Sequence, residues 1–191
     1  DEEHKLSLQV IRENMLKNHG YYKVTEDGVE QCLISCDDGV YRFTPPESEE
    51  QDWTVEKLAD EAASDAVLVD LDQDGEKELI LISPFHGEHI YFYKKIDGDY
   101  KKVYTYDTAD FAHAIYGGTL LGKPAVIIGH RKGERNLLLF TWEQEKGQYQ
   151  VEILDRDCGP ANVFKYERGT EEVLISTNRE IDEVAMYTFE K

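Results

Sequence analysis

Short apolar runs recur along this chain of 191 residues at a nearly constant interval. Four runs resemble one another, at residues 32–35, 79–83, 126–129 and 173–176. Within them, Ile34, Ile82, Ile128 and Ile175 are separated by 48, 46 and 47 residues. A fixed interval of this size is typical of repeat architectures, in which each repeat is one unit of supersecondary structure.

Two further series of residues repeat at the same interval. Phe43, Tyr93, Phe140 and Tyr187 follow one another at 50, 47 and 47 residues, and Val55, Val103 and Val151 at 48. The runs are short, rich in β-branched residues and bounded by Gly and Asp, which predicts strands and not helices. Three independent series with one period indicate four equivalent units.

Four short strands in about 47 residues have the size of one β-propeller blade. We therefore expect an all-β chain, a single domain over residues 1–191, that forms a β-propeller of four-stranded antiparallel blades. The repeats fall at approximately 4–50, 51–99, 100–148 and 149–191, with inner strands at 20–24, 66–70, 113–118 and 162–167. Four repeats make either a closed four-bladed ring or part of a larger ring.

The order of strands bears on ring closure. The chain begins with a lone outer strand near residues 6–10 and ends with a third strand near Phe189. We expect the first strand to pair with the strand around Met186, in the same chain or in a second copy, because exposed sheet edges promote aggregation. A homo-oligomer is the expectation if a second chain completes the ring.

Residues 69–83 contain the densest motif in the sequence. Carboxylates stand at positions 1, 3, 5 and 9 of a loop, as Asp70, Asp72, Asp74 and Glu78, with Gly75 at position 6 for a sharp turn. So many oxygen ligands suit a hard cation, above all calcium, which takes six to eight of them. Leu81 occupies position 12, where an EF-hand needs Glu, and the flanking runs are typical of strands.

This D-x-D-x-D-G-x-x-[DE]-L pattern resembles the FG-GAP or VCBS repeat of β-propellers. The repeat length and strand order carry the resemblance over the whole chain, whereas the metal motif occurs once. It predicts one Ca²⁺ ion bound by Asp70, Asp72, Asp74, the carbonyl of Glu76 and the side chain of Glu78. The alternative is an ordinary acidic turn without an ion.

Polar residues suited to binding gather in the loops at one end of the predicted blades. With this strand order, the loops before the inner strands and those between the second and third strands emerge around the axis. They contain the candidate ligand-binding residues His86, His113, His130, Arg131, Asn162, Asn178 and Arg179. Arginine offers paired donors to a carboxylate, and histidine moves protons near neutral pH. This set favours a carbohydrate or another small polar ligand, with a protein partner as an alternative.

A sugar-active enzyme is the second hypothesis. Some calcium-bearing propellers of the kind that this chain resembles are polysaccharide lyases or sugar dehydratases, which implies His113, His130 and Arg131 as candidate catalytic residues. Two histidines and one arginine converging on a single point would favour chemistry, whereas a shallow plane of aromatic rings would favour binding. The sequence leaves enzymatic activity open.

Composition narrows the choice of partners. A formal net charge of −19 at pH 7 argues against nucleic acid and anionic membranes, which both need a basic surface. Cys32, Cys36 and Cys158 are odd in number and irregularly spaced, which favours a reducing compartment such as the cytoplasm. Because the chain begins at Asp1, removal of an upstream segment and an extracellular location stay open as alternatives.

Overall fold

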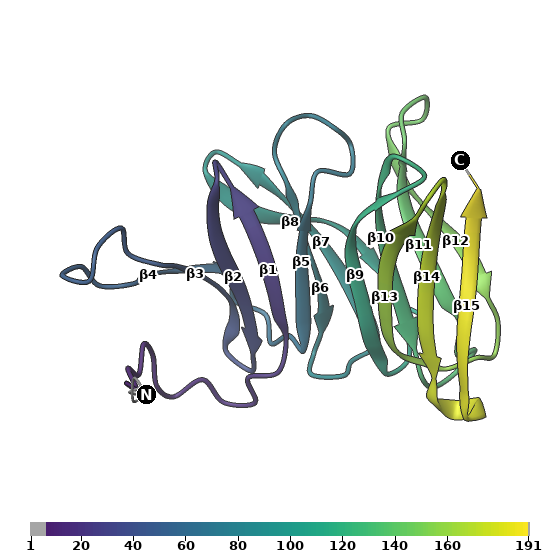
Figure 1. The fold of residues 1–191 in the computed structure, drawn as a ribbon, viewed down its shortest axis with the longest axis horizontal. Coiled ribbons are helices and arrows are strands. Elements are labelled where there is room, and N and C mark those ends of the chain that lie inside the picture. The colour runs from purple at the N-terminus through teal and green to yellow at the C-terminus, as the bar shows by residue number, and fades with distance from the viewer. Residues whose placement is uncertain (1–6, 191) are drawn as a thin grey trace, which may run out of the picture.

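The computed structural model describes residues 7–190, which form four antiparallel sheets arranged as the four blades of a β-propeller (Figure 1). The first sheet contains β1 (Tyr21–Glu26), β2 (Val29–Cys36), β3 (Gly39–Thr44) and β4 (Thr54–Ala59), and the second contains β5 (Asp65–Val69), β6 (Glu78–Ser83), β7 (His89–Ile96) and β8 (Asp99–Tyr106). The third contains β9 (Ala112–Leu120), β10 (Lys123–His130), β11 (Leu137–Glu143) and β12 (Gln148–Asp155). The fourth contains β13 (Pro160–Arg168), β14 (Glu171–Asn178) and β15 (Glu183–Glu190), with the short 3₁₀ helix η1 (Arg179–Ile181) before β15. The all-β propeller expected from the repeats is confirmed.

Tight turns set the register of the inner hairpins. Two-residue loops join β1 to β2, β7 to β8 and β9 to β10, and each ends in glycine. Both residues of each loop have positive φ, for example 51° at Asp27 and 80° at Gly28. This is the type I′ geometry whose twist matches that of paired strands, and it explains the Asp-Gly sequences at two of the three turns.

The hydrophobic core lies between neighbouring sheets. In β6, which is buried along its whole length, Ile80 and Ile82 belong to the cluster shared with the third sheet. Leu79 and Leu81 belong to the cluster shared with the first sheet. Side chains alternate across a strand, so a sheet with neighbours on both sides needs apolar residues at every position. The apolar runs that repeat in the sequence are therefore the second strands of the blades.

The inner strands approach one another closely at Gly117 in β9. A Cβ atom at this position would lie 2.7 Å from Cβ of Val67 in β5, so a larger residue would push the two strands apart. From the first sheet, the Tyr22 hydroxyl reaches past β5 and donates a hydrogen bond of 2.6 Å to the Gly117 carbonyl. This contact links the first three blades around the axis.

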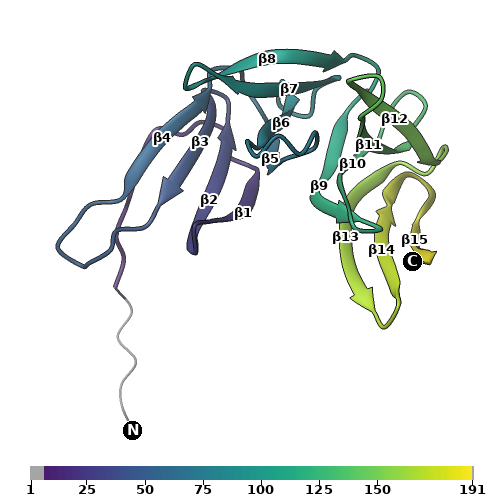
Figure 2. The ribbon, with the colours of Figure 1, turned by 90° about the horizontal axis from the view of Figure 1, so that it is seen from above.

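The four blades form an open arc and not a closed ring. Figure 2 shows the first and last sheets at opposite ends of this arc. The strand expected at residues 6–10 is not observed. Residues 7–10 are not a strand, and Leu6 lies outside the described residues. The last sheet has three strands. Within one chain, the expected pairing with the strand around Met186 is therefore wrong. The chain instead has the form of part of a larger ring.

The two end sheets differ in how their outer faces are covered. On the first sheet, Met15 from the segment before β1 packs on the cluster of Tyr41 and Phe43, and the Arg12 guanidinium lies 4.3 Å from the centre of the Tyr41 ring. On the last sheet, Phe164 and Met186 flank Ile175 in register and are 65% and 54% exposed. The last sheet thus presents an apolar face of the kind that other blades bury.

Residues 7–190 include no helix that is long and apolar enough to cross a membrane. Cys32, Cys36 and Cys158 are all free thiols.

We expect a second copy of the chain to cover the apolar face of the last sheet, giving a solution mass of twice 22.0 kDa by light scattering. Replacing both Phe164 and Met186 with Glu should yield a monomer, because charges would then have to be buried at the contact. Val103→Glu is the matched control, since Val103 is 43% exposed in β8. A monomeric native chain would rule out ring completion by a second copy.

Candidate functional site

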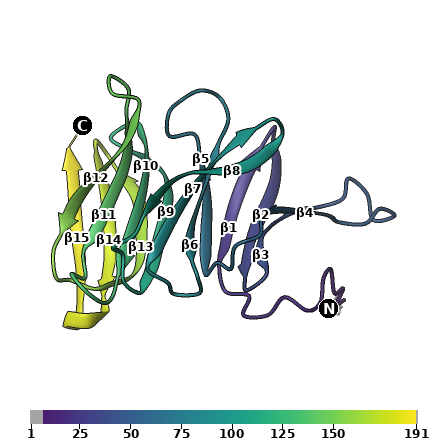
Figure 3. The ribbon, with the colours of Figure 1, turned by 180° about the vertical axis from the view of Figure 1, so that it is seen from behind.

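The loops of the four blades separate into two groups at opposite ends of the strands, as Figures 1 and 3 show. The lower end in both views carries the loops that precede β1, β5, β9 and β13 and those that follow β6, β10 and β14. The upper end carries the acidic loop of residues 70–77, between β5 and β6. The candidate polar-ligand residues and the candidate metal loop therefore lie apart.

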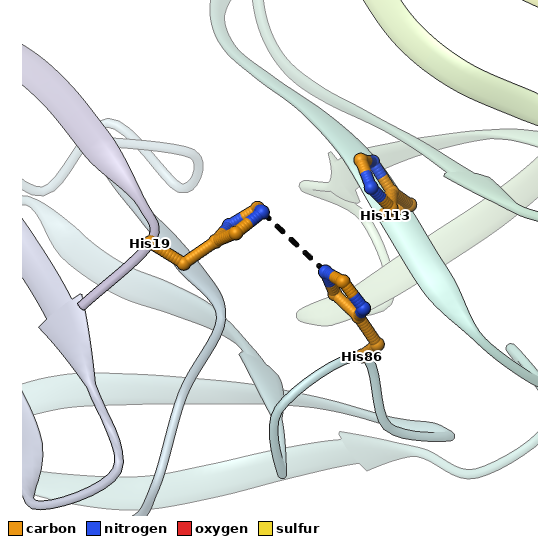
Figure 4. Close-up of side chains that lie close together, drawn as sticks. All are labelled: His19, His86 and His113. Carbon is orange, nitrogen blue, oxygen red and sulfur yellow. Dashed lines mark hydrogen bonds between the residues drawn. The ribbon is translucent and has the colours of Figure 1, made fainter. Parts of the chain in front are cut away.

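Three histidines from three different parts of the chain meet at the lower end (Figure 4). His19 precedes β1, His86 lies in the loop after β6, and His113 is the second residue of β9. The Nε2 atoms of His19 and His86 are 3.4 Å apart. The ring centres of His86 and His113 are 4.7 Å apart, and those of His19 and His113 are 5.7 Å apart.

Backbone and carboxylate oxygens hold two of these rings in place. The Nδ1 atom of His19 lies 3.2 Å from the Ser64 carbonyl and 3.3 Å from the Asp65 carboxylate. The Nδ1 atom of His113 lies 2.7 Å from the carbonyl of Ala161, the second residue of β13. A carbonyl only accepts, so both Nδ1 atoms carry the proton, which leaves Nε2 as the free acceptor of each ring.

Close packing of the backbone brings His19 to Asp65. A Cβ atom on Gly20 would lie 2.5 Å from the Ser64 carbonyl oxygen and 2.7 Å from the Asp65 carboxylate, so only glycine fits between His19 and β1. His86 has a left-handed backbone with φ of 50°. Such backbone conformations in non-glycine residues are concentrated at functional sites.

Aromatic rings and cations border the three histidines. The Phe85 ring stacks on His86 at 4.2 Å between centres, and the Phe111 ring lies 5.0 Å from His86. The cationic groups of Arg131 and Lys132 lie 4.9 Å and 5.0 Å from the centre of the Phe111 ring. A cavity of about 360 Å³ adjoins His86 and is lined also by Phe111, Lys132, Asp110 and Glu88.

The surroundings of His86 and His113 favour the neutral forms of these two rings. Burial, together with the neighbouring histidines, lowers the pKa of His86. Burial also lowers the pKa of His113, and nearby His19 and Arg179 act in the same direction. Burial raises the pKa of the Asp65 carboxyl to about 6, against the opposing effect of His19. His86 and His113 are therefore uncharged near neutral pH.

His130 lies in the interior of its own loop. It is 1% exposed, with Nδ1 3.0 Å from the Lys132 carbonyl and Nε2 accepting a 3.0 Å hydrogen bond from the backbone N–H of Asn136. Both ring nitrogens are thus used to shape the β10–β11 loop. The geometry gives His130 a structural role, where the sequence suggested ligand binding or catalysis.

The arginines come near the site but are paired with a carboxylate. Nε of Arg131 donates to Glu180 at 2.9 Å, and Arg131 is stacked over Phe111 beside His86 and His113. Arg179 is 65% exposed at the side chain and lies 3.5 Å from the same carboxylate. Of the candidate catalytic residues, His113 lies with His19 and His86, His130 lies apart in its own loop, and Arg131 is one ring removed and held by Glu180.

The two candidate asparagines belong to the last sheet. Asn178 is fully buried and bonds to Ser176, Glu183 and Tyr187 within that sheet. Asn162 is exposed, and its backbone N–H donates to Thr177. Asn178 thus holds the end of β14, and neither residue is part of the histidine cluster.

His19 and Asp65 were not predicted as ligand-binding residues. His19 lies two residues before the first inner strand, nearly the same place that His113 takes in the third repeat. That shared place in the repeat is the signal that could have identified it. Phe85 and Phe111, which enclose His86, follow from no pattern in the sequence.

The acidic loop at the opposite end brings together three of its five expected ligands. Oxygens of Asp70, Asp72 and Glu78 lie within 4.8 Å of one another. Asp74 and Glu76 are exposed, and backbone N–H groups of the loop donate to Asp70, Asp72 and Asp74. These hydrogen bonds shape the turn that Gly75, with φ of 96°, allows.

A lysine from the neighbouring strand points into this acidic loop. The Lys94 ammonium bonds to Asp72 and lies 3.3 Å from Asp74 and 3.8 Å from Glu78. It therefore supplies a positive charge among the carboxylates that were expected to bind calcium. A calcium ion would have to displace this ammonium group.

A larger cavity, of about 640 Å³, lies elsewhere, between the outer strands β4 and β8. Its cations are already paired, Lys57 with Asp60 at 2.8 Å and Lys102 with Glu61 at 2.9 Å. Internal pairing leaves little unbalanced charge for a ligand. The histidine cluster is the better candidate site because ring nitrogens of three histidines lie within 4.8 Å of one another.

Solved structures share the fold of this chain. A crystal structure from Bacteroides fragilis matches 91% of this chain and 50% of its own chain, with a TM-score of 0.58 and 18% sequence identity. One from Bacteroides uniformis matches 91% and 55%, with a TM-score of 0.54 and 13% identity. Each is described as a "putative 6-phosphogluconolactonase", and this chain spans about half the length of either. No model of a known protein family matches the sequence, and no curated protein matches it.

The buried, neutral His130 should make stability depend on pH. Burial lowers the pKa of His130, so below about pH 6.5 the unfolded chain binds a proton that the folded chain excludes. As the pH is lowered below about 6.5, the free energy of unfolding should therefore decrease, by up to about 1.4 kcal/mol per pH unit for this residue.

His130→Gln should destabilise the fold by roughly 1–3 kcal/mol at pH 7.5, because Asn136 N–H and the Lys132 carbonyl lose their partner. The difference from the native chain should narrow in urea melts at pH 5. His89→Gln, which alters a half-exposed histidine, is the control. A difference that stays constant over this pH range would show that His130 is not held neutral.

Proposed function

We propose that this chain is a propeller module that binds a small anionic or polyhydroxyl ligand, such as a sugar acid, at the histidine-lined end of the blades. The observation that carries the proposal is the convergence of His19, His86 and His113 beside the cavity that His86 and Lys132 line. Neutral imidazoles exchange hydrogen bonds with hydroxyl groups, since each ring has one donor and one acceptor.

The size and charge of this region support such a ligand. Small-molecule pockets usually have about 300–1,000 Å³ and a few polar groups on apolar walls, which the cavity of about 360 Å³ beside Phe111 matches. Lys132 is exposed at its edge, in a chain with a net charge of −19. Lys132 supplies a cation for an anionic group, and Asp110 and Glu88, which also line the cavity, can accept hydrogen bonds from hydroxyl groups.

A sugar-active enzyme is the second candidate function. It is supported by the three imidazoles at one point and by the solved structures of similar fold, each described as a "putative 6-phosphogluconolactonase". On this hypothesis, His86 or His113 would serve as the general base for attack of water on the carbonyl carbon of a sugar lactone. The bond from that carbon to the ring oxygen would break, and the ring oxygen would take up a proton as a hydroxyl group of the sugar acid. His130 and Arg131 are poorer candidates, because their own loops and Glu180 already engage their nitrogen atoms.

We also propose that the acidic loop takes up calcium when Lys94 leaves it. The support is the cluster of Asp70, Asp72 and Glu78, together with the resemblance of the loop to FG-GAP and VCBS repeats. The ion would be structural, since it would lie at the end of the blades away from the histidines.

The ligand proposal can be tested by calorimetry with 6-phosphogluconate, gluconate and glucose. We expect binding of the anionic sugars, and a loss of roughly tenfold or more in Lys132→Gln and in His86→Gln, because a hydrogen bond to a charged group contributes about 1.5–3 kcal/mol. His89→Gln should bind like the native chain. Absence of binding for all three probes would refute the proposal, and turnover of 6-phosphogluconolactone that His86→Gln abolishes would establish the enzyme instead.

The calcium proposal predicts a specific effect of Lys94. Lys94→Gln should strengthen calcium binding about tenfold or more, because the ion no longer displaces an ammonium group and about 1.4 kcal/mol corresponds to tenfold. Thermal melts in calcium and in chelator should show this as a larger shift of Tm, and Asp72→Ala should remove the shift in both backgrounds. A Lys94→Gln chain whose melting ignores calcium would refute the site.

A further inference from the structure

We propose that His19, His86 and His113 bind one transition-metal ion of the zinc type, in a three-histidine site with an open coordination position. The proposal concerns the same end of the blades as the proposed ligand site. It does not depend on a sugar ligand, because the metal can be measured alone.

The distance between the first two histidines fits a shared ion. Zinc binds imidazole nitrogens at about 2.0–2.1 Å in tetrahedral geometry, which places two ligand nitrogens roughly 3.3–3.4 Å apart. The Nε2 atoms of His19 and His86 are 3.4 Å apart. His113 offers a ring nitrogen within 4.8 Å of both, so a small rotation of its ring would complete three ligands.

The hydrogen bonds on the far side of the rings are those of metal-binding histidines. Such histidines usually donate their second N–H to a carbonyl or carboxylate, which fixes the tautomer and aims the other nitrogen at the metal. His19 has this arrangement with Ser64 and Asp65, and His113 has it with the Ala161 carbonyl at 2.7 Å. In both, Nε2 is left as the ligand atom.

His86 would change its protonation pattern on binding. Because His19 keeps its proton on Nδ1, the 3.4 Å contact between the two Nε2 atoms needs the proton of His86 on Nε2. With the metal bound, the neutral His86 would carry its proton on Nδ1 and give its Nε2 lone pair to the ion. The number of protons on the ring stays the same.

The site is held in place before any ion enters. Phe85 and Phe111 pack on the His86 ring, and the left-handed backbone at His86 directs it toward the other two. Gly20 allows His19 to approach Asp65. Sites built from side chains fixed by packing bind more tightly, because little ordering is left to occur on binding.

Three protein ligands leave a tetrahedral ion with one position for water or another ligand. His86 also lines the cavity of about 360 Å³ that contains Lys132 and Phe111. A ligand in this cavity would lie next to the ion. An ion at this position would attract the anionic group that we propose for the ligand.

The test uses Zn²⁺ by equilibrium dialysis and Co²⁺ by its visible absorption, on the untagged chain and without any sugar. We expect one ion per chain and a tetrahedral Co²⁺ spectrum. His86→Gln and His113→Gln should each weaken binding by about 100-fold or more, because even the loss of a group behind a metal ligand costs 10- to 100-fold.

Three controls make the result specific to these histidines. His89→Gln retains the cluster, Asp72→Asn alters the other candidate cation site, and Lys132→Gln alters the proposed sugar site; all three should bind Zn²⁺ like the native chain. Circular dichroism melts without metal should show that every variant is folded. Absence of Zn²⁺ binding, binding that survives His86→Gln, or binding lost in Asp72→Asn would each overturn the proposal.

Discussion

The packing of each sheet on the face of the next is the interaction on which the rest of this structure depends. The middle sheets bury both faces, which is why β6 is buried along its whole length and apolar from Leu79 to Ile82. Each buried Leu or Ile side chain contributes about 1.5–3 kcal/mol by leaving water. The same requirement explains the spacing of Ile34, Ile82, Ile128 and Ile175, because every blade must present an apolar second strand at an equivalent place. An end sheet satisfies the requirement on one face only, as the exposed Phe164 and Met186 show.

This packing also creates the histidine cluster. The inner strands begin and the second strands end at the same end of the blades, so residues in these loops come together although 67 residues separate His19 from His86. The Tyr22–Gly117 hydrogen bond and the close contact of Gly117 with Val67 hold the three inner strands in that relation. The geometry of the cluster is therefore a property of three blades jointly, and no single repeat contains it.

The sequence predicted what every repeat shares and missed what is particular to one loop. The period, the strand types and the end of the blades at which His86 and His113 lie all follow from positions that repeat. His130 looked like its neighbours in the sequence, but its loop folds back so that Asn136 and Lys132 take both ring nitrogens. The Lys94 ammonium reaches the acidic loop from β7. The motif of residues 70–78 gives no information about a positive charge that comes from another strand. His19 was not predicted as a ligand-binding residue, although it takes nearly the same place in the first repeat that His113 takes in the third.

Because each blade packs mainly on its neighbours in the arc, the chain approximates a one-dimensional array in which stability is nearly a sum over adjacent pairs. Unfolding of such an array begins where a unit has a single neighbour. The first blade has Met15 and Arg12 on its free face, whereas the last has its apolar row exposed, so local opening should be easiest in β13–β15. Amide hydrogen exchange would then form a gradient along the chain, fastest in the last blade and slowest in the second and third. An ion or ligand held by His19, His86 and His113 would bridge three units of the array, and would raise the cooperativity of its first three blades while leaving the fourth to open independently.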